Sequence, residues 1–188
     1  MNRIEFLNQF HPISGQDYDL LVAAMVPRTY SRGDTIVASG QVQRELFFVR
    51  EGVQMAAYEE GDHPQVIAFT YAPNLCAIPD SFSLQKPAPS CLRALTDSAL
   101  DAISYEELQR IFDRSQSVER LFRRMTEAIL AGVIHRHWEL HALSMEERYK
   151  QFCRRSPHLL QLVPHKYIAS YLGMDATNFS KLYNRVKF

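Results

Sequence analysis

The segment from His165 to Arg185 carries the residues whose types and spacing most clearly suggest chemistry. Short polar and basic side chains recur at helical spacing in its second half. The set comprises Ala176, Thr177, Asn178, Ser180, Lys181, Asn184 and Arg185. Hydroxyl, amide and cationic groups of this kind hydrogen-bond to base edges and phosphates in the major groove, and alanine and threonine methyls can contact a thymine methyl. We therefore predict that this face binds DNA.

Two crossing helices are needed to hold such a face in place. Ala169 supplies a small residue where the two backbones would approach, and Gly173 suits a turn with positive φ. Asp175 can cap the second helix. Apolar residues fill the angle between the helices, at Ile168, Leu172, Met174, Phe179 and Leu182. The pattern predicts a helix-turn-helix, although a helical hairpin that binds no nucleic acid would share several of these features.

The charge distribution supports an anionic partner at the same end of the chain. The 188 residues contain 21 basic and 21 acidic side chains, so the formal net charge is zero. Residues 148–188 hold eight basic side chains and one acidic one, whereas residues 1–112 hold eight basic and 14 acidic ones. DNA, RNA and an acidic membrane surface all fit a basic C-terminal segment, and so does a solvated basic face.

A long amphipathic helix is predicted over residues 115–143, a segment with no proline and one glycine. Apolar residues recur along it at steps compatible with one helical face. We predict a dimer helix with Val118, Phe122, Met125, Ile129, Val133 and Leu140 in its seam. The same stripe could instead lie against the chain's own N-terminal domain.

The N-terminal part up to residue 114 alternates short apolar stretches with turn signals, after a helical pattern in residues 1–27. Strands at spacings of about ten residues are typical of a β-sandwich or barrel. They are predicted at residues 35–37, 46–49, 55–58, 66–69, 91–95 and 99–103. A serine followed three residues later by glutamate predicts helix starts at Ser104 and Ser144.

Several classes of protein fit the sequence poorly. No apolar run approaches the roughly 18 residues of a membrane span, and three scattered cysteines form no disulfide framework. His137 and His141 are four residues apart and could share a metal, but a surface or seam role is favoured, and we predict no metal site. No catalytic motif is present, so we expect a cytoplasmic protein that is not an enzyme and contacts no membrane.

Taken together, these segments resemble the Crp/Fnr family of bacterial transcription regulators over nearly the whole chain. The matching residues are 30–34 (YSRGD), Gly40, 46–52 (LFFVREG), Glu147, Arg148 and 168–173 (IASYLG). The resemblance implies an α+β fold: an N-terminal jelly roll, or double-stranded β-helix, with flanking helices, then a long dimerisation helix and a C-terminal helix-turn-helix domain. The expected domains are residues 1–114, 115–143 and 144–188, and the wing that usually follows the recognition helix is expected to be truncated or absent.

The chain departs from the family where cyclic nucleotides bind. Members that bind them use a Gly-Glu pair and, about ten residues on, an Arg-Ser or Arg-Thr pair; here these positions fall near residues 77–78 and 88–89, and the arginine is missing. A buried cyclic phosphate needs a fixed cation, so we do not expect cAMP as the effector. The resemblance places an effector pocket at Ala77, Ile78, Asp80, Ala88 and Ser90, with an unknown effector and no cofactor.

The function that the resemblance implies is a homodimeric, sequence-specific DNA-binding regulator of transcription. Its partners would be a palindromic operator, a second copy of the chain and, as a candidate, RNA polymerase. The alternative is a ligand- or protein-binding sensor whose C-terminal domain has lost DNA binding.

Overall fold

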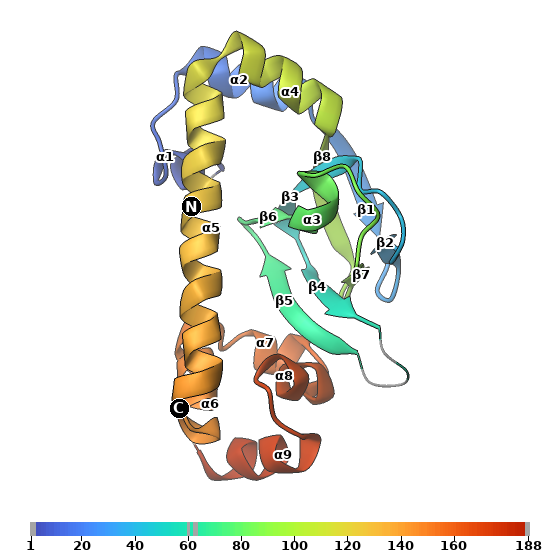
Figure 1. Ribbon diagram of the computed structural model, residues 1–188, viewed down its shortest axis with the longest axis vertical. Helices are drawn as coiled ribbons and strands as arrows, with labels where there is room; N and C mark the ends of the chain where they lie inside the picture. Colours follow the sequence, from blue (N-terminus) through green and yellow to red (C-terminus); the bar gives the residue numbers. More distant parts are fainter. Residues whose placement is uncertain (1–2, 60, 62–63, 187–188) are drawn as a thin grey trace.

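The computed structural model describes residues 3–59, 61 and 64–186, and it contains two four-stranded antiparallel sheets (Figure 1). The first sheet has the strand order β1-β8-β3-β6 and the second β2-β7-β4-β5. The strands are β1 (Val26–Tyr30), β2 (Thr35–Val37), β3 (Glu45–Glu51), β4 (Val53–Tyr58), β5 (Gln65–Tyr71), β6 (Leu75–Cys76), β7 (Cys91–Ala94) and β8 (Ser98–Ser104). The sheets face each other as a jelly roll.

Helices flank the roll at both ends of the chain. They are α1 (Arg3–Asn8), α2 (Gly15–Ala23), α3 (Pro79–Phe82), α4 (Tyr105–Arg114), α5 (Gln116–Ala142), α6 (Met145–Arg155), α7 (Leu159–Leu162), α8 (His165–Tyr171) and α9 (Ala176–Arg185). Helix α5 has 27 residues, which corresponds to about 40 Å. It runs along one side of the molecule, from α2 and α4 at one end to α6 and α9 at the other (Figure 1). Within the described residues, no helix combines the length and the hydropathy that a membrane span requires.

Strand β3 shows how the roll is built from alternating side chains. Phe47 and Val49 point between the two sheets, whereas Leu46 and Phe48 pack outward against α1, α2, α4 and the first half of α5. Strand β4 divides its residues in the same way, because Val53, Met55 and Ala57 face the C-terminal helices. The molecule therefore has one core between the sheets and one on the outer face of each sheet.

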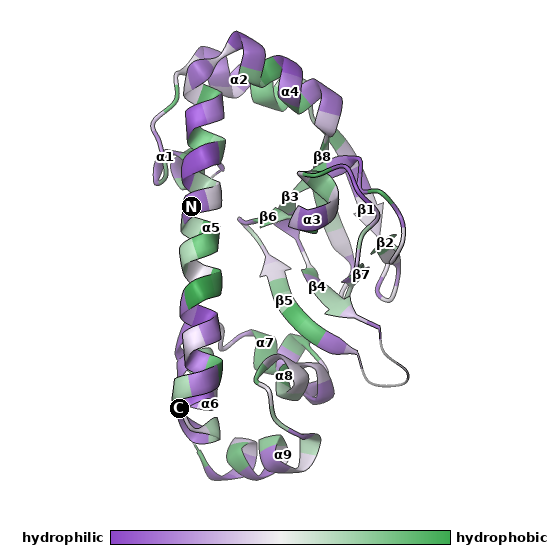
Figure 2. Ribbon diagram, in the orientation of Figure 1, coloured by the Kyte–Doolittle hydropathy of each residue, from purple (hydrophilic) through white to green (hydrophobic). Residues whose placement is uncertain are grey.

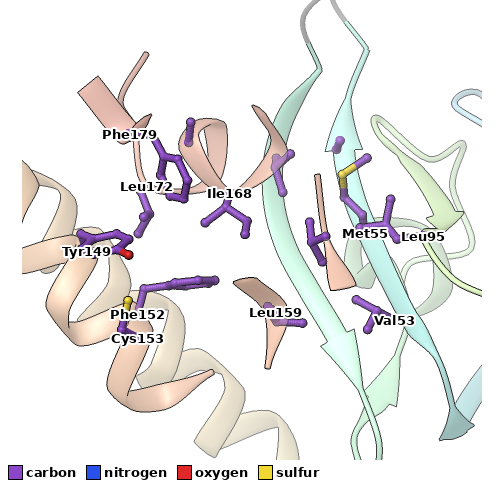
Figure 3. Packing of buried hydrophobic residues seen from close by; sticks show 14 of the residues in the cluster. Val53, Met55, Leu95, Tyr149, Phe152, Cys153, Leu159, Ile168, Leu172 and Phe179 are labelled. Carbon is purple, nitrogen blue, oxygen red and sulfur yellow. The ribbon is translucent and has the colours of Figure 1, made fainter. Parts of the chain in front are cut away.

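The core on the outer face of the second sheet joins that sheet to the C-terminal helices. Figure 3 shows Val53, Met55 and Leu95 on the sheet side, with Leu159 and Ile168 between them and the aromatic residues of α6. Tyr149, Phe152 and Phe179 are each about 1% exposed. Burial of this kind contributes about 25 cal/mol for each Å² of apolar surface, so the C-terminal helices are held firmly on the roll.

The strands predicted from the sequence all lie within observed strands, apart from one or two residues at their ends. The expected helical pattern over residues 1–27 is wrong at its end, because Val26–Tyr30 forms strand β1 and pairs with β8. Pro27 is tolerated in this strand because β1 lies at the edge of its sheet, where a residue without an N–H interrupts no hydrogen bonds to a further strand.

The six residues predicted for a dimer seam do not share one environment. Val118, Phe122 and Met125 are at most 9% exposed and lie in the core beneath the first sheet. These three side chains are therefore not free to contact a partner, and their assignment to a seam is corrected. Leu140 is half-buried and lies beside Gly173. Of the predicted set, Ile129 and Val133 are exposed.

The helical pair at the C-terminus has the local features that the sequence predicts. Ala169 is 2% exposed, and Gly173 has φ +62° in the turn that follows α8. Asp175 caps α9, since its side chain accepts a hydrogen bond from the N–H of Asn178 at 2.7 Å. Ser144 and Glu147 form a reciprocal capping box at the start of α6. The short helix α7 was not predicted.

Candidate nucleic-acid interface

Helix α9 has one buried face and one exposed polar face. Phe179 and Leu182 point inward, and the ring of Phe179 lies edge-on to Tyr149 with centroids 5.7 Å apart. Six of the seven residues predicted to contact DNA are exposed: Ala176, Thr177, Ser180, Lys181, Asn184 and Arg185. The helix lies at the end of the molecule remote from α2 and α4, so nothing drawn in Figure 1 covers it on its outer side. This face is accessible to a large ligand.

Asn178, the seventh predicted residue, has a local structural role. It is half-buried, and its side-chain amide donates to Asp175 Oδ2 at 2.6 Å while its backbone N–H bonds to Oδ1 of the same carboxylate. Hydrogen bonds from Asn178 lower the pKa of Asp175, so the capping carboxylate is ionised and favours the helix N-terminus. Asn178 therefore fixes the start of α9 and is poorly placed to contact a base.

The basic charge of the C-terminal segment is partly neutralised by acids that precede it in the chain. Glu146 pairs with both Lys150, at 2.6 Å, and Arg185. The hydrogen bond and charge of Lys150, with the charge of Arg185, lower the pKa of Glu146. Glu139 is 3% exposed and pairs with Arg155 at 3.3 Å. These pairs leave a smaller free positive charge than the count over residues 148–188 suggests.

Lys181 is the basic residue of α9 that remains available. No described acid lies within ion-pairing distance of it, and its side chain is exposed in the middle of the polar face. Arg148, in contrast, donates to the carbonyl oxygens of Leu140 and Gly173 and so braces the junction of α5 with the turn before α9. Tyr183, which the sequence analysis did not single out, is 41% exposed and extends the same surface.

A docking contact between α8 and strand β5 fixes the helical pair on the roll. Ser170 Oγ accepts from the N–H of Val66 at 2.9 Å and donates to the carbonyl of Pro64 at 2.9 Å. The rings of Phe69 and Tyr171 pack with centroids 5.1 Å apart. The guanidinium carbon of Arg136, on α5, lies over the Tyr171 ring, 3.6 Å from its centroid. Tyr171, at the end of α8, therefore contacts both β5 and α5.

Replacing Ser170 with alanine is expected to loosen this docking contact. The substitution leaves the Val66 N–H and the Pro64 carbonyl without their partner, which costs about 1 to 3 kcal/mol for partly buried groups. We expect faster amide hydrogen exchange at Val66 and in α8, and a lower midpoint of thermal unfolding. Ser180→Ala, on the exposed face of α9, is the control and should leave both unchanged. Equal protection in the two variants would contradict the role of Ser170.

Three of the five residues predicted to line an effector pocket are buried. Ile78 and Ala88 fill the core between the sheets, Ser90 is 2% exposed, Ala77 packs outward, and Asp80 is exposed. The neighbouring loop is held by side-chain hydrogen bonds. Gln43 accepts from the Ile78 N–H at 2.8 Å, and Ser81 donates to the Lys86 carbonyl at 2.7 Å. These hydrogen bonds hold the segment that the resemblance assigns to an effector.

Two open hollows occur elsewhere, at the end of the roll where β3 turns into β4. One, of about 410 Å³, lies between the roll and α7 and is lined by Tyr71, Asp97, His158 and Leu162, among others. The other, of about 370 Å³, lies beside β1 and shares Glu51 and Asp97 with the first. Gly52 is required at this turn, because a Cβ on it would lie 2.4 Å from Ser98 Oγ. Neither hollow includes a residue of the predicted pocket.

The thiols in the described chain are poorly suited to redox sensing. Cys76, Cys91 and Cys153 are all free and at most 3% exposed. Burial raises the pKa of the Cys76 thiol to about 12, so the reactive thiolate is scarce near neutral pH. Burial also raises the pKa of Cys91 and Cys153. A packing role accounts for all three.

The second half of α5 presents an uncovered apolar face. Ile129, Leu130, Val133, Ile134 and Trp138 are each between 51% and 61% exposed. Figure 2 shows the corresponding hydrophobic band midway along the helix. Singly exposed apolar residues are common, but five together on one helix mark a contact surface. Ile129 and Val133 belong to the seam predicted from the sequence, whereas Leu130 and Ile134 were not predicted. The four-residue spacing of Leu130, Ile134 and Trp138 was a usable signal.

Comparison with solved structures identifies the same architecture in several known proteins. FixK2 from Bradyrhizobium japonicum aligns with a TM-score of 0.75 at 15% identity, over 86% of this chain and 83% of that one. A CooA mutant from Carboxydothermus hydrogenoformans gives 0.69 at 16% identity, over 98% and 83%. The c-di-GMP-responsive global regulator CLP of Xanthomonas campestris gives 0.66 at 18%, over 92% and 91%. The sequence matches no family model and no curated protein sequence.

At such low identities the likeness establishes the fold. The alignments span the jelly roll, the long helix and the C-terminal helices together, since they cover most of each chain. The α+β architecture with antiparallel sheets and one long helix is therefore the fold of these three proteins.

Proposed function

We propose that this chain is a homodimeric, sequence-specific DNA-binding regulator of transcription. The observation that carries the proposal is the two-sided character of α9. Its inner side is anchored by Phe179 and Leu182, and its outer side exposes Thr177, Ser180 and Lys181. A helix held in this way can enter the major groove, which is wide enough for an α-helix and carries a distinct pattern of hydrogen-bonding groups for each base pair.

Five residues on the outer side of α9 have a defined task in this proposal. Ala176 and Thr177, in the first turn, are placed for methyl contacts with thymine, and Lys181 for a guanine edge or a phosphate. Asn184 and Arg185 lie one turn further on and face the backbone of the duplex. For Arg185 to contact a phosphate, its pair with Glu146 must be exchanged for one with DNA. Such an exchange makes binding dependent on salt.

The second element of the proposal is a dimer through the apolar face of α5. A second copy that covers Ile129, Leu130, Val133, Ile134 and Trp138 would remove this surface from water. A two-fold pair of long helices places one α9 on each side of the axis, as a palindromic operator requires. In this proposal the chain divides after residues 114 and 143, and α5 connects the N-terminal domain to the C-terminal helices.

The docking contact at Ser170 and Tyr171 suggests how the roll could control the helical pair. Because Arg136 of α5 and Phe69 of β5 both pack on Tyr171, a shift between α5 and the roll would move α8, and with it α9. An effector that favours one of two arrangements would then change the distance between the two α9 helices. We assign no effector, because the residues predicted to bind one line neither of the two hollows described above.

The proposal is tested by the salt dependence of binding to duplex DNA of mixed sequence. Affinity measured by fluorescence anisotropy should fall steeply between 50 and 200 mM salt, as expected when cations on the protein displace counterions from phosphates. A folded dimer that does not bind any duplex at 50 mM salt would instead favour the alternative, a sensor whose helical pair has lost DNA binding. The partial neutralisation of the basic segment by Glu139 and Glu146 is the observation in favour of that alternative.

A further inference from the structure

Two histidines extend the apolar face of α5 toward its C-terminus. Leu130, Ile134, His137 and His141 follow one another at steps of four, three and four residues, which is the spacing of the seam in a two-stranded coiled coil. Both histidines are exposed. Their rings lie side by side, with centroids 4.4 Å apart. The pair thus lies on the same line as the apolar residues that the proposed dimer covers.

The geometry of this pair suits a shared transition-metal ion. Zinc binds histidine nitrogens at about 2.0–2.1 Å in a tetrahedron, which sets neighbouring nitrogens about 3.3 Å apart. Imidazoles one helical turn apart, with rings as close as these, can reach that separation. The neighbouring cation in the sequence, Arg136, is stacked on Tyr171 and pairs with the Glu139 carboxylate at 3.8 Å. Its charge is therefore partly compensated within the same chain.

One chain alone does not complete such a site. Among residues 3–59, 61 and 64–186 of a single copy, no group of three or more histidine, cysteine, aspartate or glutamate side chains could hold a metal ion. A second copy would add its own pair. When the two α9 helices lie at the same end of the dimer, the two α5 helices run parallel, and equal positions face each other across the seam.

From these observations we infer that His137 and His141 of two copies form a four-histidine site for Zn²⁺, or a similar borderline metal ion, at the seam. The inference rests on the dimer in the proposed function and adds a ligand that tightens it. Neutral imidazole suits zinc, and four ligands complete the tetrahedral coordination that zinc usually adopts. Metal binding would then stabilise the dimer and, through it, the spacing of the two α9 helices.

The test is sedimentation equilibrium of the full chain with Zn²⁺ and with EDTA, combined with titration of bound zinc. We expect one zinc per dimer and a dimer dissociation constant at least ten-fold lower with zinc. The double variant His137→Ala/His141→Ala should lose the zinc response while staying dimeric in EDTA. His135→Ala is the matched control, because that imidazole lies on another face of α5, 3.4 Å from the Glu139 carboxylate.

The possible results separate this inference from the proposed function. A wild-type dimer that does not respond to zinc, or a double variant that responds as the wild type does, overturns the metal site and leaves the dimer intact. A chain that stays monomeric in both conditions overturns the site and the proposed dimer together. A monomer in EDTA that becomes a dimer with zinc supports the site in its strongest form.

Discussion

Replacing Lys181 with alanine should weaken binding to specific DNA by roughly a hundred-fold. Lys181 is the exposed cation of α9 that no described acid pairs with, so its charge is fully available to the duplex. A loss of about 1.5 kcal/mol in each half-site is typical of a base or phosphate contact, and the dimer loses it twice. Anisotropy titrations of the variant and the wild type against the same operator measure the difference.

A charge-matched control separates a specific contact from a change in net charge. Arg110 lies on α4, at the end of the molecule remote from α9, and its partner is Glu107 on the same helix (Figure 1). Arg110→Ala removes one positive charge and should change affinity by less than two-fold. Equal losses in the two variants would show that α9 is not the contacting surface.

Replacing Leu130 with aspartate should convert the proposed dimer into a folded monomer. Leu130 is 57% exposed in the single chain, so the substitution leaves the chain's own core intact. In the dimer it would lose the burial of two leucine side chains, which contributes about 3 to 6 kcal/mol. The dissociation constant should therefore rise by roughly two to four powers of ten. Sedimentation measures the change, and circular dichroism checks that the chain is folded.

Leu84 supplies the matched control for this substitution. It is 61% exposed, in the turn after α3 and away from α5. Leu84→Asp introduces the same change at a similar exposure and should leave the dimer unaffected. A monomeric wild type, or a Leu130→Asp variant that dimerises as well as the Leu84→Asp variant does, would show that this face of α5 is not the seam.

The sequence was most informative where a residue's role depends on its near neighbours. Gly173, Asp175 and the capping box at Ser144 concern contacts within four residues, and each lies where it was predicted. The strands were predicted with similar success because alternation is a local pattern. Strand β1 was missed because its pairing with β8 depends on residues about 75 positions away.

The errors in the candidate sites have the same origin. Periodicity shows that Val118, Phe122 and Met125 lie on one face of a helix, but not whether that face meets the chain's own sheet or another copy. A count of charges along the chain does not reveal that Glu146 folds against Lys150 and Arg185. Similarly, the residues expected around an effector were chosen by register, and three of them are buried in the structure. Tertiary contacts decide which face of α5 is covered, how much positive charge is free and which of the predicted pocket residues are buried.

The most direct test of DNA recognition is selection of bound duplexes from a random library by the purified chain, alone and with a bacterial metabolite extract. We expect enrichment of a palindrome whose half-sites are one helical turn, about 10 base pairs, apart, with two chains bound to each duplex. The Lys181→Ala variant should enrich the same palindrome weakly or not at all. A folded dimer that enriches no sequence in either arm would contradict the central claim.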